Sequence, residues 1–341
     1  MTIELSRRGM LCSLASAAVA TVVRSSATAA PVAVAAQHAP PKAMAHDAFI
    51  AGLRGGRTVD PKVNGFDPQL MLRDFDRGST HRLPGGRVVR EWEIESGERE
   101  IELAPGVKFP AWTYNDRVPG PTLRATEGEL LRIHFVNRSG HPHSIHFHGV
   151  HPAAVDGVPG NGASILEPGR RTTYEFEATP FGLHLYHCHA FPLALHLARG
   201  LYGAFLIDPA AGREEADELV MVMNGFDLDA DGENEIYAVN TIPFAYMADP
   251  VKVRRGELVR IHLANLVEHD PINSFHVHAN LFHYIPTGTS IQPSEFTDTV
   301  MQCQGQRGIV ELRFPFAGNF MFHAHQSEFT ELGWMGMFEV S

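Results

Sequence analysis

The chain has 341 residues and carries 28 Lys and Arg against 39 Asp and Glu, which gives a formal net charge of −11 with histidine neutral. This acidic balance argues against nucleic acid as a partner. Three cysteines exclude a disulfide framework, whereas 31 glycines and 23 prolines among short alternating runs favour an all-β protein. The length is sufficient for two core-forming domains after removal of a leader.

The N-terminus has the pattern of an export signal. Arg7-Arg8 precedes an apolar stretch from Leu11 to Val23, which is shorter than the roughly 20 residues that a mature membrane anchor needs. Alanine-rich tripeptides follow and predict cleavage near residues 29–36. We therefore expect residues 1–37 to be a twin-arginine signal peptide, and the mature protein to be periplasmic or secreted without a membrane anchor.

Beyond this leader the sequence predicts an arm and two strand-rich domains. Residues 38–87 are rich in Pro, Gly, Asp and Arg and have little periodicity, which is typical of a surface arm. Alternating strands begin at Val88, and a polar linker, PAAGREEAD, interrupts them near residues 209–217. We expect domains at 88–211 and 217–341, each a β-sandwich of Greek-key type.

Two histidine motifs lie in the first of these domains. Because side chains alternate along a strand, His146 and His148 of HSIHFHG share a face that His143 does not. In His187-Cys188-His189 the thiol likewise points away from both imidazoles. One face can therefore gather a thiolate and two imidazoles, the ligand set of a blue-copper electron-transfer site, and the other face four histidines. The first set is His143, Cys188 and His196, and the second is His146, His148, His187 and His189.

The second domain repeats the first. EGELLRIHFVN at 127–137 recurs as RGELVRIHLAN at 255–265, and the pairs His276/His278 and His323/His325 follow in the same order and similar spacing. A repeat of this size indicates two copies of one domain. The blue-copper set is absent from the second copy, where Ala324 replaces Cys188, Asn273 replaces His143 and no histidine follows His325.

The number of paired histidines exceeds chance. A chain with 20 histidines in 341 residues has about one H-x-H pair by chance, yet this sequence has five. Four of them occupy corresponding positions of the repeat. In contrast, His134 and His262 alternate with apolar residues of the repeated strand and are expected on its solvated face. Cys303 is expected to be a buried, small apolar side chain.

These motifs resemble those of multicopper oxidases, and specifically of the two-domain, laccase-like members with type-1 copper in the N-terminal domain. The stretch DLDADGENEIYAVN at 227–240 also resembles these small members. The resemblance covers roughly residues 88–341. It implies an all-β fold of two tandem cupredoxin-like Greek-key β-sandwiches, and oxidation of phenols, aromatic amines or metal ions coupled to reduction of O₂ to water. The physiological reductant stays open.

The resemblance also implies the cofactor, the ligands and the assembly. It predicts about four copper ions per chain and a homotrimer in which domain one of each subunit meets domain two of the next. Asp156 and Glu328 are candidate proton relays, although Asp156 is equally well explained as a turn residue. Type-1 copper would be held by His143, Cys188 and His196 beside the non-coordinating axial Leu201, type-2 copper by His146 and His276, and the type-3 pair by His148, His187, His189, His278, His323 and His325.

Three other classes of metal protein use some of these histidine motifs. A copper nitrite reductase uses a type-1 copper and one catalytic copper with three histidines, which does not require complete pairs in both repeats. An electron carrier needs the type-1 site alone. A cupin uses H-x-H but gives no reason for His-Cys-His. Copper content separates the first two from the oxidase, at about four ions per chain for the oxidase, two for the reductase and one for the carrier.

Overall fold

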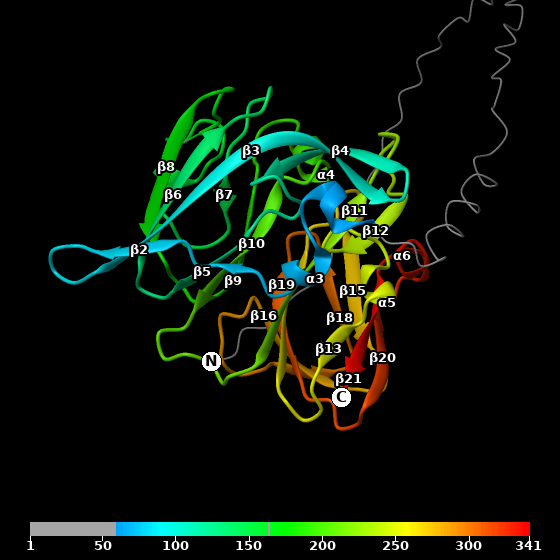
Figure 1. The fold of residues 1–341 in the computed structure, drawn as a ribbon. Helices are drawn as coiled ribbons and strands as arrows, with labels where there is room; N and C mark the ends of the chain where they lie inside the picture. Colours follow the sequence, from blue (N-terminus) through cyan, green and yellow to red (C-terminus); the bar gives the residue numbers. More distant parts are fainter. Residues whose placement is uncertain (1–58, 163) are drawn as a thin grey trace, which may run out of the picture. The chain divides into compact units, whose positions relative to one another are not determined.

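The computed structural model describes residues 59–162 and 164–341, so the predicted signal peptide and the first part of the arm lie outside the described residues. The described residues belong to one compact unit and are mostly strands (Figure 1). None of the helices in this part of the chain is long and apolar enough to cross a membrane. The helices are α2 (Pro61–Asn64), α3 (Pro68–Met71), the 3-10 helix η1 (Ala153–Val155), α4 (Leu193–Ala198), α5 (Ala245–Ala248) and α6 (Ser327–Glu331).

The strands form four sheets. Those of the first half are β1 (Phe75–Asp76), β2 (Ser79–Arg82), β3 (Val88–Ala104), β4 (Val107–Tyr114), β5 (Thr122–Thr126), β6 (Leu130–Asn137), β7 (His146–Phe147), β8 (Arg171–Glu177), β9 (Gly182–His187) and β10 (Tyr202–Asp208). Those of the second half are β11 (Asp217–Phe226), β12 (Ile236–Val239), β13 (Val251–Val253), β14 (Val259–Asn265), β15 (Ile272–Val277), β16 (Phe282–Pro286), β17 (Glu295–Thr297), β18 (Thr299–Cys303), β19 (Arg307–Leu312), β20 (Gly318–His323) and β21 (Met335–Val340).

The two halves share the central part of their topology. In the first half, sheet β1-β5-β10-β9-β7 accompanies sheet β2-β3-β6-β8, with β4 paired to β3. In the second half, sheet β13-β21-β20-β15-β18 accompanies sheet β12-β11-β14-β19-β16-β17. The order β5-β10-β9-β7 matches β13-β21-β20-β15, and the parallel pair β3–β6 recurs as β11–β14. The predicted all-β class with two tandem β-sandwiches is confirmed.

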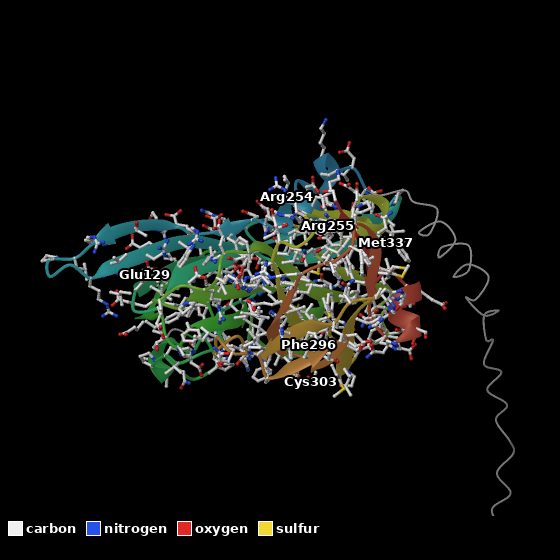
Figure 2. All side chains as sticks on the ribbon, turned by 90° about the horizontal axis from the view of Figure 1, so that it is seen from below. Glu129, Arg254, Arg255, Phe296, Cys303 and Met337 are labelled. Carbon is white, nitrogen blue, oxygen red and sulfur yellow. The ribbon has the colours of Figure 1, made fainter. Side chains whose placement is uncertain are left out.

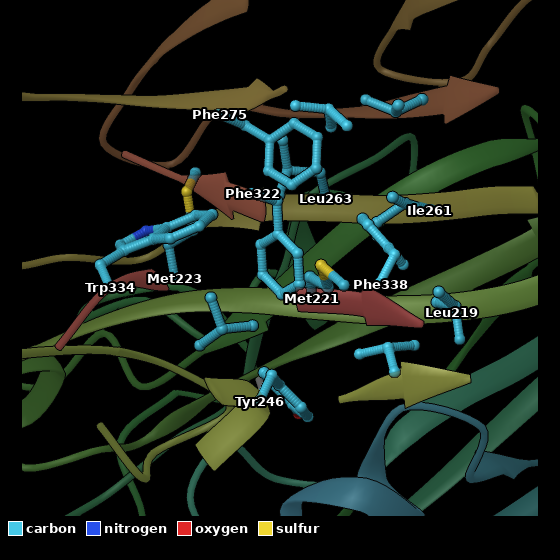
Figure 3. Close-up of a cluster of buried hydrophobic side chains, with 14 of the residues drawn as sticks. Leu219, Met221, Met223, Tyr246, Ile261, Leu263, Phe275, Phe322, Trp334 and Phe338 are labelled. Atoms are coloured by element: carbon cyan, nitrogen blue, oxygen red, sulfur yellow. The ribbon is translucent and has the colours of Figure 1, made fainter. Parts of the chain in front are cut away.

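The second sandwich has a core of large apolar side chains between its two sheets (Figure 3). Strands β11 and β14 supply alternate residues such as Met221 and Leu263, and the facing sheet supplies Phe275, Phe322 and Phe338. Each such side chain contributes about 1.5–3 kcal/mol on full burial. This core fixes the faces of β15 and β20 and therefore the direction in which their histidines point.

The repeated strand differs in burial between the two halves. In β6 alternate residues are buried, and the ring of His134 is hydrogen-bonded to Thr173 Oγ1 at 2.9 Å on the partly exposed face. In β14 every residue is buried, including His262. The expectation that His262 is solvated is wrong, because a further apolar cluster packs the outer face of the β11–β14 sheet against residues of the first sandwich such as Leu185.

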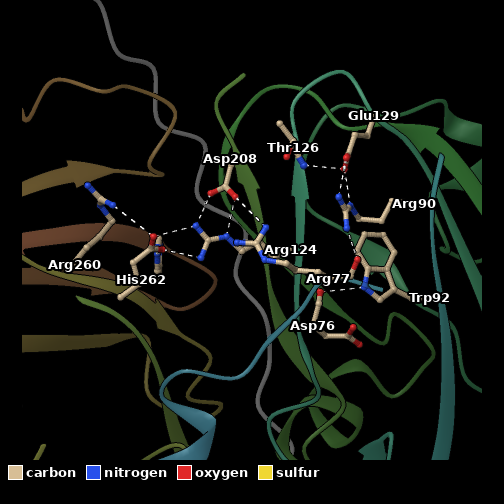
Figure 4. Close-up of polar contacts among 11 residues, drawn as sticks. Asp76, Arg77, Arg90, Trp92, Arg124, Thr126, Glu129, Asp208, Arg260 and His262 are labelled. Atoms are coloured by element: carbon tan, nitrogen blue, oxygen red, sulfur yellow. Dashed lines mark hydrogen bonds and ion pairs between the residues drawn. The ribbon is translucent and has the colours of Figure 1, made fainter. Parts of the chain in front are cut away.

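A polar network also joins the sandwiches (Figure 4). Arg124 donates to both oxygens of Asp208 at 2.8 Å and to Glu218 at 3.0 Å. On the other side Glu218 lies 2.9 Å from His262 Nε2 and 3.7 Å from Arg260. Glu218 therefore connects a cation of the first sandwich with two groups of the second.

Candidate metal centres

Three buried side chains converge beside the end of β9. Cys188 follows β9 directly, His143 lies on an isolated bridge to Leu166, and His196 is in the last turn of α4. The Sγ atom of Cys188 lies 3.2 Å from His196 Nδ1 and 3.8 Å from His143 Nδ1, and the two nitrogens are 3.1 Å apart. The structure thus brings together all three residues of the predicted type-1 set.

The electrostatics of this cluster suit a metal ion. Burial lowers the pKa of His143 to about 3 and that of His196 to about 4, so both imidazoles are neutral ligands at pH 7. Burial raises the pKa of Cys188, which therefore carries a proton until a metal ion displaces it. Sγ already accepts from the backbone N–H groups of Ser144 and Ala190, each at 3.5 Å. One thiolate and two imidazoles are the donors of a blue-copper site.

The surroundings of this cluster are apolar and aromatic. Leu201 is fully buried in the same core as Cys188, and its backbone donates to His196 O and accepts from Cys188 N–H. Its side chain offers no donor atom. Trp112, which the sequence did not single out, packs its ring 4.8 Å from that of His196 and 5.1 Å from that of His143. No motif marks Trp112, because its strand β4 is remote from both histidines in sequence.

The predicted first half of the histidine cluster also assembles. His148 and His187 place their Nε2 atoms 3.0 Å apart, and the rings of both lie within 5.2 Å of His146. His189 stacks on His187 and lies 5.3 Å from His146. Burial lowers the pKa of His148 to about 3 and that of His187 to about 4, which keeps them neutral and able to ligate.

The second half has the same geometry. His278 and His323 place their Nε2 atoms 2.8 Å apart, and their rings lie 5.1 and 5.3 Å from His276. His325 lies 5.4 Å from His276. In each half the fourth histidine, His189 or His325, stands outside the trio whose ring nitrogens lie within 4.8 Å of one another.

The two histidine halves are not joined to each other in the described part of the chain. Across residues 59–162 and 164–341, no hydrogen bond or ring contact joins a histidine of the first half to one of the second. His278 and His325 are exposed, and His276 and His323 are partly exposed. The second half therefore offers imidazoles at the surface, where another histidine set could complete the coordination.

The candidate proton relays differ in their placement. The Oδ1 atom of Asp156 lies 3.1 Å from His146 Nδ1 and 3.8 Å from His151 Nε2, so its carboxylate is next to the first half. Glu328 is exposed in the first turn of α6. Its carboxylate has no hydrogen bond to a histidine within the described part of the chain. Asp156 thus stays a candidate with a defined partner, and Glu328 is without one.

The expectation for Cys303 is wrong. Cys303 is exposed at the end of β18, an edge strand of its sheet. On this strand Val300 and Gln302 point into the sandwich, so the alternation turns Met301 and Cys303 outward.

Comparisons with known proteins show which family this chain resembles. Two profiles of a family described as multicopper oxidase match residues 96–212 and 217–341. A solved structure titled "Crystal structure of multicopper oxidase" is 61% identical with a TM-score of 0.82, and the match covers 83% of this chain and 100% of that one. Copper-containing nitrite reductase of Neisseria meningitidis serogroup A is 29% identical over 255 residues, which are 68% of this chain and 64% of that protein. Laccase-2 of Botryotinia fuckeliana is 37% identical over 139 residues, or 39% of this chain and 23% of its own length. The chain thus spans less than two thirds of the length of these two relatives.

Proposed function

The chain belongs to the multicopper oxidase family and is a copper oxidoreductase, and from that premise we propose that it is a laccase-like oxidase. It couples one-electron oxidation of phenols, aromatic amines or metal ions to four-electron reduction of O₂ to water. The observation that carries the proposal is the pair of complete four-histidine sets, one of which is joined to the cysteine cluster through His187-Cys188-His189.

Copper, when bound, supplies one-electron transfer at the cysteine cluster and the redox chemistry of O₂ at the histidine sets. The protein itself holds the ligands of the two centres at fixed positions close to each other. Cys188 is buried between two histidines of the other set, so a few covalent bonds connect the two centres. His187 Nδ1 is hydrogen-bonded to Cys188 O at 2.9 Å, which fixes that ring and leaves Nε2 for the metal.

Protons for water formation need a route to the histidine sets. Asp156 is the residue best placed to hold one, because its carboxylate lies 3.1 Å from His146 Nδ1 and 26% of the side chain is open to solvent. The same contact orients His146. We assign Asp156 both tasks and assign none to Glu328.

We further propose a homotrimer that holds about four copper ions per chain, in which the first histidine half of one subunit faces the second half of the next. The separation of the two halves within one chain and the exposure of His278 and His325 support it. The twin-arginine pattern of residues 1–37 supports export to the periplasm or beyond, which fractionation of cells expressing the full chain would test.

Nitrite reduction is the second candidate, because relatives with that name are 29% identical over 68% of this chain. Eight histidines exceed the three that one catalytic copper requires, which favours the oxidase. The test is a pair of assays on the copper-loaded protein, O₂ uptake with a phenol or an aromatic amine and nitrite consumption with a reduced dye. We expect O₂ uptake and about four copper ions per chain. Nitrite consumption with about two copper ions would reverse the assignment.

A further inference from the structure

The methionines of the second sandwich are scattered in sequence, but the sheet topology gathers several of them. In sheet β13-β21-β20-β15-β18 the residues that point inward are apolar or fully buried, such as Phe322, Phe338 and Gln302. Their sequence neighbours point to the opposite face. The sulfur-bearing residues on that outer face, hereafter the sulfur face, are Met301, Cys303, Met321, Met335 and Met337.

Strand register places these sulfurs around the second histidine half. Met321 is directly opposite Met337, and Met335 is directly opposite His323. The N–H of His278 donates to Met321 O at 2.9 Å. Because Cβ atoms of directly opposed residues are about 4.5–5.5 Å apart, these thioethers are within reach of one another and of the imidazoles.

Strand β18 places further sulfur side chains on the other side of the second histidine half. Met301 is opposite Ser274, whose Oγ accepts from the N–H of His325 at 2.7 Å. Met301 is 66% exposed, and Cys303 lies two residues further on the same face. Figure 2 labels Cys303 and Met337, which lie on β18 at one edge of this sheet and on β21 near its other edge. Sulfur side chains therefore border the histidines on both sides.

The chemistry of these ligands is selective. Thioethers and thiols are soft donors that favour Cu(I), whereas imidazole accepts copper in either oxidation state. We propose that the sulfur face captures Cu(I) and passes it to the second histidine half, a role that rests on the proposed function of that half as a copper site. The transfer is an exchange of thioether and thiolate ligands for imidazoles. Cys303 gives its proton to solvent when it binds Cu(I) and regains one when the ion leaves, and no electron moves, so the step needs no oxidant or reductant.

In the proposed trimer this face meets the next subunit, so the competing explanation is that these side chains serve only that contact between copies. Substitution of methionine by leucine distinguishes Cu(I) binding from a mere contact role, because leucine keeps the size and apolarity of methionine and removes the sulfur. Met335 is left unchanged in the test, since it also packs against the core. The variant is Met301→Leu, Cys303→Ser, Met321→Leu and Met337→Leu combined, and the control is Met221→Leu with Met223→Leu, which are fully buried.

The experiment uses the copper-free full chain without oxygen and titrates Cu(I) against a chromogenic Cu(I) chelator. We expect the four-residue variant to hold Cu(I) at least about tenfold more weakly than the wild type, the scale on which loss of a metal's partners lowers affinity, and the control to match the wild type. X-ray absorption spectroscopy at the copper edge should also show fewer sulfur ligands around Cu(I) in the same variant. An unchanged Cu(I) affinity overturns the proposal, and if the oligomer is weakened at the same time, the face is a contact between copies.

Loading with Cu(II) separates this inference from the proposed function. The variant should still take up full copper from Cu(II) and become blue, because its type-1 and histidine ligands are intact. If the wild type does not become blue with Cu(II), the proposed oxidase fails, while the difference in Cu(I) affinity remains measurable on its own.

Discussion

The Sγ atom of Cys188 lies 3.2 Å from the Nδ1 atom of His196, with both side chains buried. Cys188→Ser should therefore abolish the intense blue absorption and the oxidation of reductants, because serine cannot supply the soft ligand of this site. Copper content should fall by about one ion per chain, since the histidine sets lie on the other strand face. Absorption spectra and metal analysis check both. Cys303→Ser is the matched control, and persistence of the blue band in Cys188→Ser would falsify the ligand assignment.

Leu201 is the basis of a prediction about redox potential. Its side chain is buried in the core that contains Cys188, and its backbone is hydrogen-bonded to the backbone of both Cys188 and His196. We expect Leu201→Met to lower the type-1 potential, because a weak thioether ligand stabilises Cu(II). A redox titration that follows the blue absorption band measures the reduction potential of the type-1 site. Leu206→Met, also buried but in a different environment, should leave the potential unchanged, and a raised potential in Leu201→Met would mean that residue 201 does not face the metal.

Trp112 shields the same site. Its ring packs against His143 and His196 and also lies 4.7 Å from that of His141, which in turn is hydrogen-bonded to Glu98 at 2.9 Å. Trp112→Ala should admit water and lower the type-1 potential, because a wetter site stabilises the more highly charged Cu(II). Trp112→Phe keeps an apolar ring and should have a much smaller effect. Equal potentials in wild type and Trp112→Ala would show that Trp112 does not control solvent at this site.

Much of this arrangement could be predicted from local patterns. Period-2 alternation and the internal repeat predicted the two sandwiches. Side-chain parity around Cys188 predicted two separate clusters, and the structure places the side chains in two such clusters. Where prediction failed, tertiary contacts decided. His262 is buried because the first sandwich covers the outer face of its sheet. Cys303 is exposed because β18 is an edge strand with Gln302 pointing inward, and Trp112 reaches the histidines only through the packing of β4.

The network between the sandwiches predicts a dependence of stability on pH. Burial disfavours ionisation of Glu218, but hydrogen bonds from His262 and Arg124 outweigh it and lower its pKa to about 2. Because the pKa of an unfolded Glu is about 4.3, ionised Glu218 stabilises the fold fully above that pH, and this stabilisation is lost as the pH falls toward 2. Glu218→Gln should therefore lower the free energy of unfolding at pH 7 by more than the roughly 1 kcal/mol that an exposed ion pair contributes.

Chemical denaturation at several pH values tests this dependence, and the difference between Glu218→Gln and wild type should shrink below pH 4.3. Glu100→Gln is the control, because its ion pair with Lys108 is exposed and such pairs contribute at most about 1 kcal/mol. A difference that stays constant with pH would mean that the charge of Glu218 is not what stabilises the fold.

The last prediction concerns assembly. His146 and His276 belong to halves that do not meet within one chain, so the proposed trimer builds each cluster from two subunits. His146→Ala and His276→Ala chains should each be inactive alone. When the two are unfolded or dissociated together and reassembled in equal amounts, about one quarter of the interfaces in a ring pair an intact first half with an intact second half. Activity per interface should recover to about that fraction of wild type, measured by O₂ uptake.

A cluster built within one chain predicts no recovery at all, because neither mutant chain has both of its histidine halves intact. A mixture that forms mixed trimers, verified with a mass-tagged partner, and still lacks activity would therefore rule out the shared cluster.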